Sequence, residues 1–260
     1  MNDVLIVSAD GPVHRWTLNR PKERNALNRA LVDALLRAAE ATARDSSCRA
    51  VLLSGTPPVF CAGSDVAEFS GREIEAIAQH QSRWPELRHA LRALEIPVVA
   101  KITGGAFGGG LFLATYADYR LADERSIFSA PEVALGWLPP GGIEELIVAV
   151  GVARARQLVL TGARIRARRA LEIGLVDEVI PPQRLDAAAE HILSYLARLP
   201  RESVASVKRY FGQRSGLNER ERDELQLAEF EKDLKTSAAR ESIDRFRRAG
   251  NGNSAEPRSV

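Results

Sequence analysis

Short apolar runs that alternate with helix-like segments constrain the fold of this chain more than any other feature. Residues 50–54 and 97–102 are mostly apolar and lie next to glycine or proline, which is typical of strands buried on both faces of a sheet. After Asn28, which is suited to cap a helix, apolar residues recur at helical spacing (Leu31, Leu35, Ala38 and Ala41). Strands that alternate with helices predict an α/β fold built from βαβ-type units.

The remaining pattern predicts how the chain is organised. Strands are expected at residues 4–8, 13–18, 119–122, 126–129 and 175–180, and a helical region at 72–94 in which Pro85 should break or kink the helix. An apolar helix is expected at 111–115, and further helices at 185–199, 203–211 and 218–248. We therefore expect a core over residues 1–200, a helical region over 201–249 and a flexible polar tail over 250–260.

Composition excludes several classes of protein. The 260 residues include 36 basic and 34 acidic side chains, a net charge of +2 that argues against a dedicated nucleic-acid binder. No apolar run could span a bilayer and residues 1–20 do not resemble a signal peptide, so we expect a cytoplasmic protein with no membrane partner. Neither Cys48 and Cys61 nor the four histidines have metal-ligand spacing, which predicts no metal site.

A glycine-rich segment, residues 104–110, follows the second buried strand and opens an apolar helix. Backbone N–H groups at such a turn are free to bind an electronegative atom, and the missing side chains let a ligand approach closely. The segment has neither the Lys-Ser/Thr of a phosphate-binding loop nor the acidic residue of a dinucleotide fingerprint. A tight turn packed against the sheet is the alternative interpretation.

Two further segments contain residue types suited to catalysis. In residues 60–66, small residues around Gly63 favour close backbone approach, and Cys61 is a possible nucleophile, although its apolar neighbours favour an inert buried thiol. In residues 129–137, Glu132 is a lone carboxylate among apolar residues. Burial would raise its pKa into the range of a general base, whereas a solvated loop glutamate is the alternative.

In this order and spacing, the segments resemble the enoyl-CoA hydratase/isomerase, or crotonase, family. The resemblance extends over nearly the whole chain, through residues 18–21, 25–27, 60–65, 104–110, 131–136 and 174–176. It implies the ClpP/crotonase-like α/β fold, a spiral of ββα units with a helical C-terminal oligomerisation region. It also implies an acyl-CoA substrate, no cofactor beyond the CoA of that substrate, and assembly as a homotrimer or a dimer of trimers.

The resemblance assigns the oxyanion hole to the backbone amides of Ser64 and Gly109. Two fixed donors at the thioester oxygen stabilise the developing enolate more than the substrate. Because main-chain atoms donate, replacement of the Ser64 side chain should matter little, whereas a bulky side chain at Gly109 should block the site.

The family's hydratases use two glutamates, and here the positions fall on Phe112 and Glu132. Glu132 alone is sufficient for double-bond isomerisation. Hydration would need a substitute acid, for which the candidates are Glu144, Glu145, Asp65, Glu68, His80 and His89. Phe112 and Trp137 would make the acyl pocket apolar or provide an aromatic wall for an aromatic acyl group.

By the same resemblance, Lys22 and Arg24 are expected to contact the CoA phosphates, and Ala62 is expected to contact the adenine and pantetheine. Asp65 and Gly108 are also expected to bind the substrate. The segment 246–248 is a further candidate phosphate contact.

We expect enoyl-CoA isomerisation or hydration. The alternatives are a lyase, decarboxylase or thioesterase acting on an aromatic or branched acyl-CoA, and a non-catalytic member that binds acyl-CoA or RNA.

Overall fold

The computed structural model describes residues 3–69, 73, 83–213 and 216–250. The chain divides into two compact units, Met1–Arg198 and Leu199–Val260, and each is described by itself. Residues 74–82 of the expected helical region, which include His80, and tail residues 251–260 lie outside the described residues, as do the side chains of residues 246–248.

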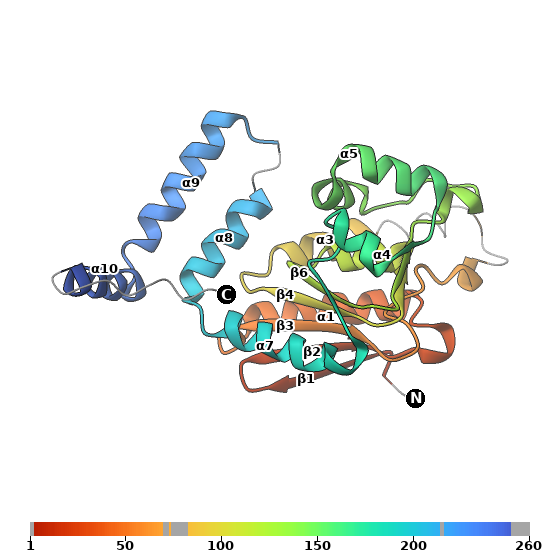
Figure 1. Ribbon diagram of the computed structural model, residues 1–260, viewed down its shortest axis with the longest axis horizontal. Helices are drawn as coiled ribbons and strands as arrows, with labels where there is room; N and C mark the ends of the chain where they lie inside the picture. The colour runs from red at the N-terminus through yellow and green to blue at the C-terminus, as the bar shows by residue number, and fades with distance from the viewer. Residues whose placement is uncertain (1–2, 70–72, 74–82, 214–215, 251–260) are drawn as a thin grey trace. The chain divides into compact units, whose positions relative to one another are not determined.

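Six strands of the described residues form the main sheet of the first unit, in the order β1-β2-β3-β4-β6-β9 (Figure 1). An antiparallel hairpin of β1 (Leu5–Asp10) and β2 (Val13–Leu18) begins it. From β2 onward the strands are parallel, through β3 (Ala50–Gly55), β4 (Val98–Ile102), β6 (Tyr119–Asp123) and β9 (Glu178–Ile180). The predicted α/β class is confirmed, and the strand expected at 175–180 covers only the last three of those residues.

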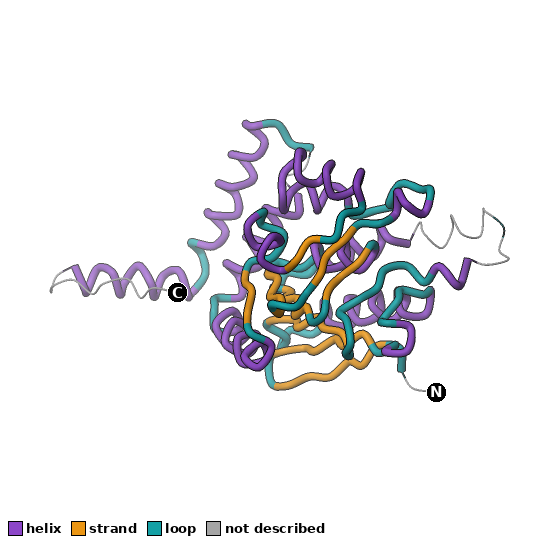
Figure 2. Tube along the Cα trace, turned by 45° about the vertical axis from the view of Figure 1, so that its right-hand side comes forward, coloured by secondary structure: helices purple, strands orange, loops and turns teal. Residues whose placement is uncertain are grey.

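Helices cover both faces of this sheet, which explains why its strands are so apolar. Successive side chains of a strand point to opposite faces. In β3, Leu53 joins the core cluster that contains Leu35 of α1 (Arg29–Arg44), whereas Leu52 joins the cluster that contains Leu193 of α7 (Leu185–Ala197). The parallel strands accordingly lie between helices, whereas the β1–β2 hairpin lies at the edge of the unit and β1 is exposed over most of its length (Figure 2).

A small second sheet contains β5 (Gly105–Phe107), β7 (Ile127–Ser129) and β8 (Ile165–Arg166). β5 runs parallel to β7 and leads directly into α4 (Gly109–Thr115). The sequence predicted only a turn at β5 and nothing at β8. Glycine is required in β5 because a Cβ on Gly105 would lie 2.1 Å from the carbonyl oxygen of Ile127.

α3 (Arg83–Arg92) and the helices after Gly141 complete the first unit. α3 contains Pro85 in its first turn, where proline costs no intrahelical hydrogen bond, so Pro85 does not interrupt this helix, and residues 74–82 of the expected helical region lie outside the described residues. The helices after Gly141 in the first unit are α5 (Ile143–Thr161), α6 (Ala167–Glu172) and α7, with Gly151 outside helical geometry inside α5.

The second unit contains α8 (Arg201–Gln213), α9 (Glu219–Asp233) and α10 (Ser237–Gly250). The prediction of a single helix over residues 218–248 is wrong, because the helix is interrupted between α9 and α10 at Thr236. Its hydroxyl donates to the carbonyl of Asp233 (2.7 Å) and accepts from the N–H of Ala239 (3.2 Å), so the side chain replaces helical backbone bonds. Arg209 of α8 is bound to Glu229 of α9 at 2.7 Å.

Asn25 ties the turn after β2 to the loop after β3. It is fully buried with a φ of +57°, a backbone conformation that asparagine tolerates better than most residues. Its amide nitrogen donates to the carbonyls of Thr56 (2.7 Å) and Val59 (2.8 Å), and its oxygen accepts from the N–H of Arg20 (2.9 Å). One buried side chain therefore provides hydrogen-bond partners for three backbone groups from two loops.

Replacement of Asn25 by alanine should therefore destabilise the fold more than loss of a helix cap. We expect Asn25→Ala to lower the free energy of unfolding by roughly 2–4 kcal/mol, because three backbone groups lose their hydrogen-bond partner at once. Asn28→Ala, the control, removes only the 2.9 Å cap to the Leu31 N–H and should cost about 1 kcal/mol. Urea denaturation measures both, and equal losses would contradict this role for Asn25.

Candidate active site

Three chain segments run side by side and end at the same edge of the small sheet. β5 is parallel to β7, with Phe107 opposite Ser129, and Cys61 forms a parallel bridge with Ala106 on the other side of β5. The carboxyl ends of parallel strands meet at one edge, where ligands of α/β proteins bind. The residues that follow each segment, at 62–64, 108–109 and 131–132, are thereby brought together.

The backbone amides of Ser64 and Gly109 lie close to each other at this edge. A Cβ placed on Gly63 would lie 3.2 Å from the Gly109 nitrogen, and one placed on Gly109 would lie 3.4 Å from the Ser64 nitrogen. Within the described part of the chain, neither of these two N–H groups donates a hydrogen bond. Both are therefore available to an acceptor from outside the protein.

Glu132 lies next to these amides because Gly108 has no side chain. A Cβ on Gly108 would lie 2.7 Å from Oε1 of Glu132, and the φ of +49° at Gly108 also favours glycine. Glu132 is 7% exposed, and its Oε2 has no hydrogen-bond partner among the described residues. Burial raises the pKa of this carboxyl above its ordinary value.

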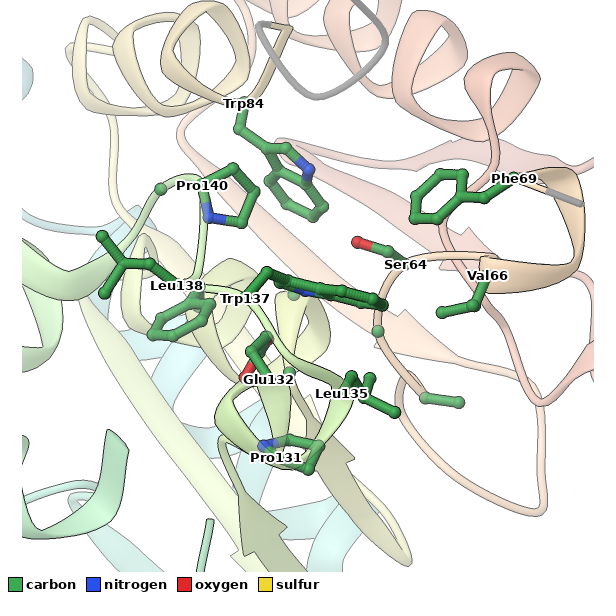
Figure 3. Close-up of a pocket in the computed structure, with 16 residues that line it drawn as sticks. Ser64, Val66, Phe69, Trp84, Pro131, Glu132, Leu135, Trp137, Leu138 and Pro140 are labelled. Atoms are coloured by element: carbon green, nitrogen blue, oxygen red, sulfur yellow. The ribbon is translucent and has the colours of Figure 1, made fainter. Parts of the chain in front are cut away.

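A pocket of about 460 Å³ joins the amides to the carboxylate, and its other side chains are almost all apolar (Figure 3). Of the residues expected in the site, seven line it: Ala62, Ser64, Gly108, Gly109, Phe112, Glu132 and Trp137. The sequence did not identify six of the other lining side chains, which are Val66, Phe69, Trp84, Leu135, Leu138 and Pro140. Among the described lining residues, Glu132 supplies the only carboxylate.

Three residues expected to bind the substrate do not line the pocket. Asp65 forms an ion pair with Arg20, with 2.8 Å between Oδ2 and Nη2. Lys22 and Arg24 are exposed, in and just after the 3-10 turn Pro21–Glu23. That turn nevertheless adjoins the pocket, because the carbonyl of Arg24 accepts a 3.0 Å hydrogen bond from the N–H of Ala62.

The candidates for a second acid also lie outside the pocket lining in the described residues. Glu144 is exposed, and Glu145 is buried in ion pairs with Arg88 (3.4 Å) and Arg92 (3.0 Å). Glu68 is close to the N–H of Arg29, and His89 is exposed. None of these side chains faces Glu132 across the pocket.

Cys61 has the environment of an inert thiol. It is fully buried, and its Sγ donates to the carbonyl of Asn25 at 3.1 Å. Burial raises the pKa of the thiol to about 12, so the nucleophilic thiolate is absent at neutral pH. No cluster of potential metal ligands occurs within the described residues, and none of the helices described there is long and apolar enough to cross a membrane.

The raised pKa of Glu132 predicts a pH-dependent cost to stability. A buried carboxyl with a raised pKa destabilises the fold once it ionises, so this cost is absent at acid pH and appears as pH rises through the raised pKa. We expect Glu132→Gln to unfold at higher urea than wild type at pH 7 and at nearly the same urea near pH 4.

A carboxylate outside the pocket provides the control for this measurement. Glu144→Gln removes an exposed charge and should leave the free energy of unfolding within about 0.5 kcal/mol of wild type. A Glu132→Gln variant that is less stable than wild type at pH 7 would contradict the assignment of an uncompensated buried carboxylate.

Comparison with known proteins agrees with this geometry. A family model described as enoyl-CoA hydratase/isomerase matches residues 9–252. The 2,3-dehydroadipyl-CoA hydratase of Escherichia coli (strain K12) is 37% identical over 205 residues, which cover 78% of this chain and 78% of that protein. The short-chain-enoyl-CoA hydratase of Clostridium acetobutylicum is 36% identical over 196 residues, 72% of this chain and 73% of that protein.

Solved structures give the same result at the level of the fold. The crystal structure of an enoyl-CoA hydratase from Mycobacterium smegmatis superposes with a TM-score of 0.91 at 28% identity, over 94% of this chain and 96% of that one. The α/β arrangement described above is thus the expected crotonase fold, and the chain belongs to the enoyl-CoA hydratase/isomerase family.

Proposed function

We propose that this protein processes acyl-CoA thioesters through an enolate, and that its reaction is the isomerisation of a 3-enoyl-CoA to the 2-enoyl form. The proposal rests on one observation. Among the described residues, the one carboxylate that lines the apolar pocket has an oxygen without a hydrogen-bond partner and shares the pocket with two backbone amides that donate to no protein group. That combination suits a reaction in which one base moves a proton beside a carbonyl.

The amides of Ser64 and Gly109 bind the thioester carbonyl oxygen in this proposal. Removal of a proton from C2 places negative charge on that oxygen, where two fixed donors stabilise the transition state more than the substrate. Each such donor is worth about 2.7–4 kcal/mol in comparable sites. The apolar lining strengthens the effect because it keeps water away from the oxyanion.

Glu132 carries the proton. Its carboxylate takes the proton from C2, and the electron pair of the broken C2–H bond moves toward C1 and onto the thioester oxygen, which gives a dienolate that extends from that oxygen to C4. As the C1–O double bond re-forms, the C1–C2 π pair forms the C2–C3 double bond and the C3–C4 π pair takes the proton that the neutral carboxyl returns to C4. The double bond moves to C2–C3, and no atom is gained or lost. A carboxyl with a raised pKa is a stronger base and holds the proton long enough to deliver it.

Hydration is the second candidate, because the two curated relatives described above are named hydratases. Hydration needs a group that holds and activates a water in addition to the group that protonates C2. Phe112 occupies the position of the family's first glutamate and provides neither a donor nor an acceptor. The pocket therefore favours isomerisation.

Binding of CoA is assigned to the rim next to Ala62. Lys22 and Arg24 are exposed at the turn that Ala62 contacts, which suits them to bind the CoA phosphates. No cofactor takes part in this proposal, because CoA belongs to the substrate.

Assembly through the second unit is also part of the proposal. Its helices keep large apolar side chains exposed, among them Phe211 (57%) and Phe230 (56%). An exposed apolar surface of this kind favours burial against other copies of the chain. We propose a homotrimer or a dimer of such trimers.

The reaction is tested with a panel of 2-enoyl, 3-enoyl and aromatic acyl-CoAs, with products identified by mass and by ultraviolet absorption. We expect 3-enoyl-CoAs to be converted without a change of mass into conjugated 2-enoyl-CoAs, which absorb more strongly. Glu132→Gln should lower turnover by about 10²–10⁴-fold while the affinity for CoA stays within a few-fold of wild type. Ser64→Ala, the control beside the hole, should retain most activity because its amide remains.

Other outcomes of the panel identify other reactions. A gain in mass of one water indicates hydration, release of carbon dioxide a decarboxylase, and free CoA a thioesterase. A fully active Glu132→Gln variant would contradict the role of Glu132. No turnover together with RNA binding that weakens steeply with salt would instead indicate a nucleic-acid-binding member.

Analytical ultracentrifugation tests the assembly. The wild-type chain should sediment as a trimer or hexamer, and Phe230→Asp should shift it toward monomers because a buried charge in the interface is costly. Glu219→Gln, a substitution in the first turn of the same helix, should leave the assembly unchanged. A wild-type monomer at micromolar concentration would contradict the proposal.

A further inference from the structure

Trp84 forms one wall of the pocket, although it belongs to no motif of the sequence. It lies in the first turn of α3 and is 3% exposed. A Cβ added to Gly109 would lie 2.8 Å from Cζ2 of the Trp84 ring, and a Cβ added to Gly141 would lie 3.3 Å from the Cβ of Trp84. The indole therefore extends from Gly141 to the amide at Gly109, on the opposite side of the pocket from Glu132 (Figure 3).

Ion pairs fix the helix that carries Trp84. Arg83 pairs with Asp33 of α1, with 2.8 Å between Nη2 and Oδ1. At the other end of α3, Arg88 and Arg92 both pair with the buried Glu145 of α5. Because Glu145 is buried, breaking its pairs with Arg88 and Arg92 would leave an uncompensated charge, whereas the partly exposed Arg83–Asp33 pair adds a weaker constraint at the start of α3. The indole is thus a fixed wall.

The region behind the indole is polar. Tyr116 lies one helical turn after Phe112, and its buried hydroxyl has no hydrogen-bond partner among the described residues. A Cβ on Gly141 would lie 3.9 Å from that hydroxyl. Burial and the nearby Glu145 carboxylate raise the pKa of Tyr116. An alkyl chain that advanced past Trp84 would press against these polar groups.

The two ends of the pocket can be distinguished. The exposed turn at Arg24 contacts Ala62, which puts the CoA end on that side. Gly142 packs on Phe112, and Gly141 adjoins Trp84 and Tyr116, so this end leads into the protein. An acyl group that starts at the two amides extends toward Trp84.

We propose that Trp84 sets the upper length of the acyl group, so that the protein is specific for short-chain acyl-CoAs. The inference rests on the proposed function, because it takes the pocket to hold the acyl group. Trp84 limits length by occupying the space between the pocket and the polar groups behind it, and removing the indole extends the apolar space.

Affinity for unreactive ligands tests this inference. Saturated acyl-CoAs from butanoyl-CoA to dodecanoyl-CoA are titrated calorimetrically into the full chain as wild type, Trp84→Ala and Trp84→Phe. In wild type, affinity should rise over the shortest chains and then stop rising. In Trp84→Ala it should continue to rise over several more methylenes, by up to about fourfold for each one buried. Trp84→Phe should give an intermediate limit.

Trp137 provides the matched control, because it is the other tryptophan of the pocket but is 40% exposed. Trp137→Ala should weaken all chain lengths by a similar factor and leave the limit where it is in wild type. Thermal unfolding checks that each variant is folded, and Trp84→Phe decides the matter if Trp84→Ala does not fold. The inference is overturned if the limit on acyl-chain length is unchanged in the folded Trp84 variants. It is also overturned if Trp137→Ala shifts that limit as far as the Trp84 variants do.

The two proposals fail in different ways. Saturated acyl-CoAs cannot isomerise or hydrate, so their affinities do not depend on the proposed reaction. If the limit on acyl-chain length depends on Trp84 but the protein turns over no enoyl-CoA, only the proposed reaction is refuted. If the protein turns over enoyl-CoAs but the limit on acyl-chain length does not change when Trp84 is replaced, only the inference about Trp84 is refuted.

Discussion

The close approach of two stretches of main chain, residues 60–64 and 105–110, is the constraint on which the rest of the site depends. The backbones are so near that a Cβ on Gly63 would lie 2.7 Å from the carbonyl oxygen of Phe107, and one on Gly110 would lie 2.5 Å from that of Cys61. Both values are below normal contact distance, so any side chain would force the stretches apart. The amides of Ser64 and Gly109 converge only because these positions are glycine.

The surrounding fold maintains this contact. The parallel pairing of β5 with β7 places Glu132 beside the same two amides, and the buried Asn25 fixes the loop that precedes Cys61. In the proposed reaction, this backbone geometry determines where the thioester carbonyl oxygen binds. The side chains around that point, Glu132 and Phe112 above all, then determine which reaction the proposed enolate undergoes.

Local patterns predicted the parts of the structure that depend on neighbouring residues. The buried strands and the cap at Asn28 follow from residues within a few positions of each other, whereas the local sequence left the burial of Glu132 open against a solvated loop glutamate. β5 escaped prediction because its stability comes from pairing with β7, twenty-two residues away, and its glycine-rich sequence resembles a turn. The break at Thr236 depends on a side chain that competes with backbone hydrogen bonds, and a helical periodicity does not reveal that competition. Trp84 enters the pocket only through the packing of α3, and the pairing of Glu145 with Arg88 and Arg92 is equally long-range.

The buried thiol of Cys61 can be used as a chemical probe of local opening around residues 60–64. Its Sγ is bonded to the carbonyl of Asn25, and a pKa of about 12 leaves it unreactive while the segment is closed. A thiol reagent can modify it only during excursions that separate residues 60–64 from β5. The rate at which Cys61 is labelled, with peptide mapping to separate it from Cys48, therefore measures how often residues 60–64 separate from β5 in the native protein.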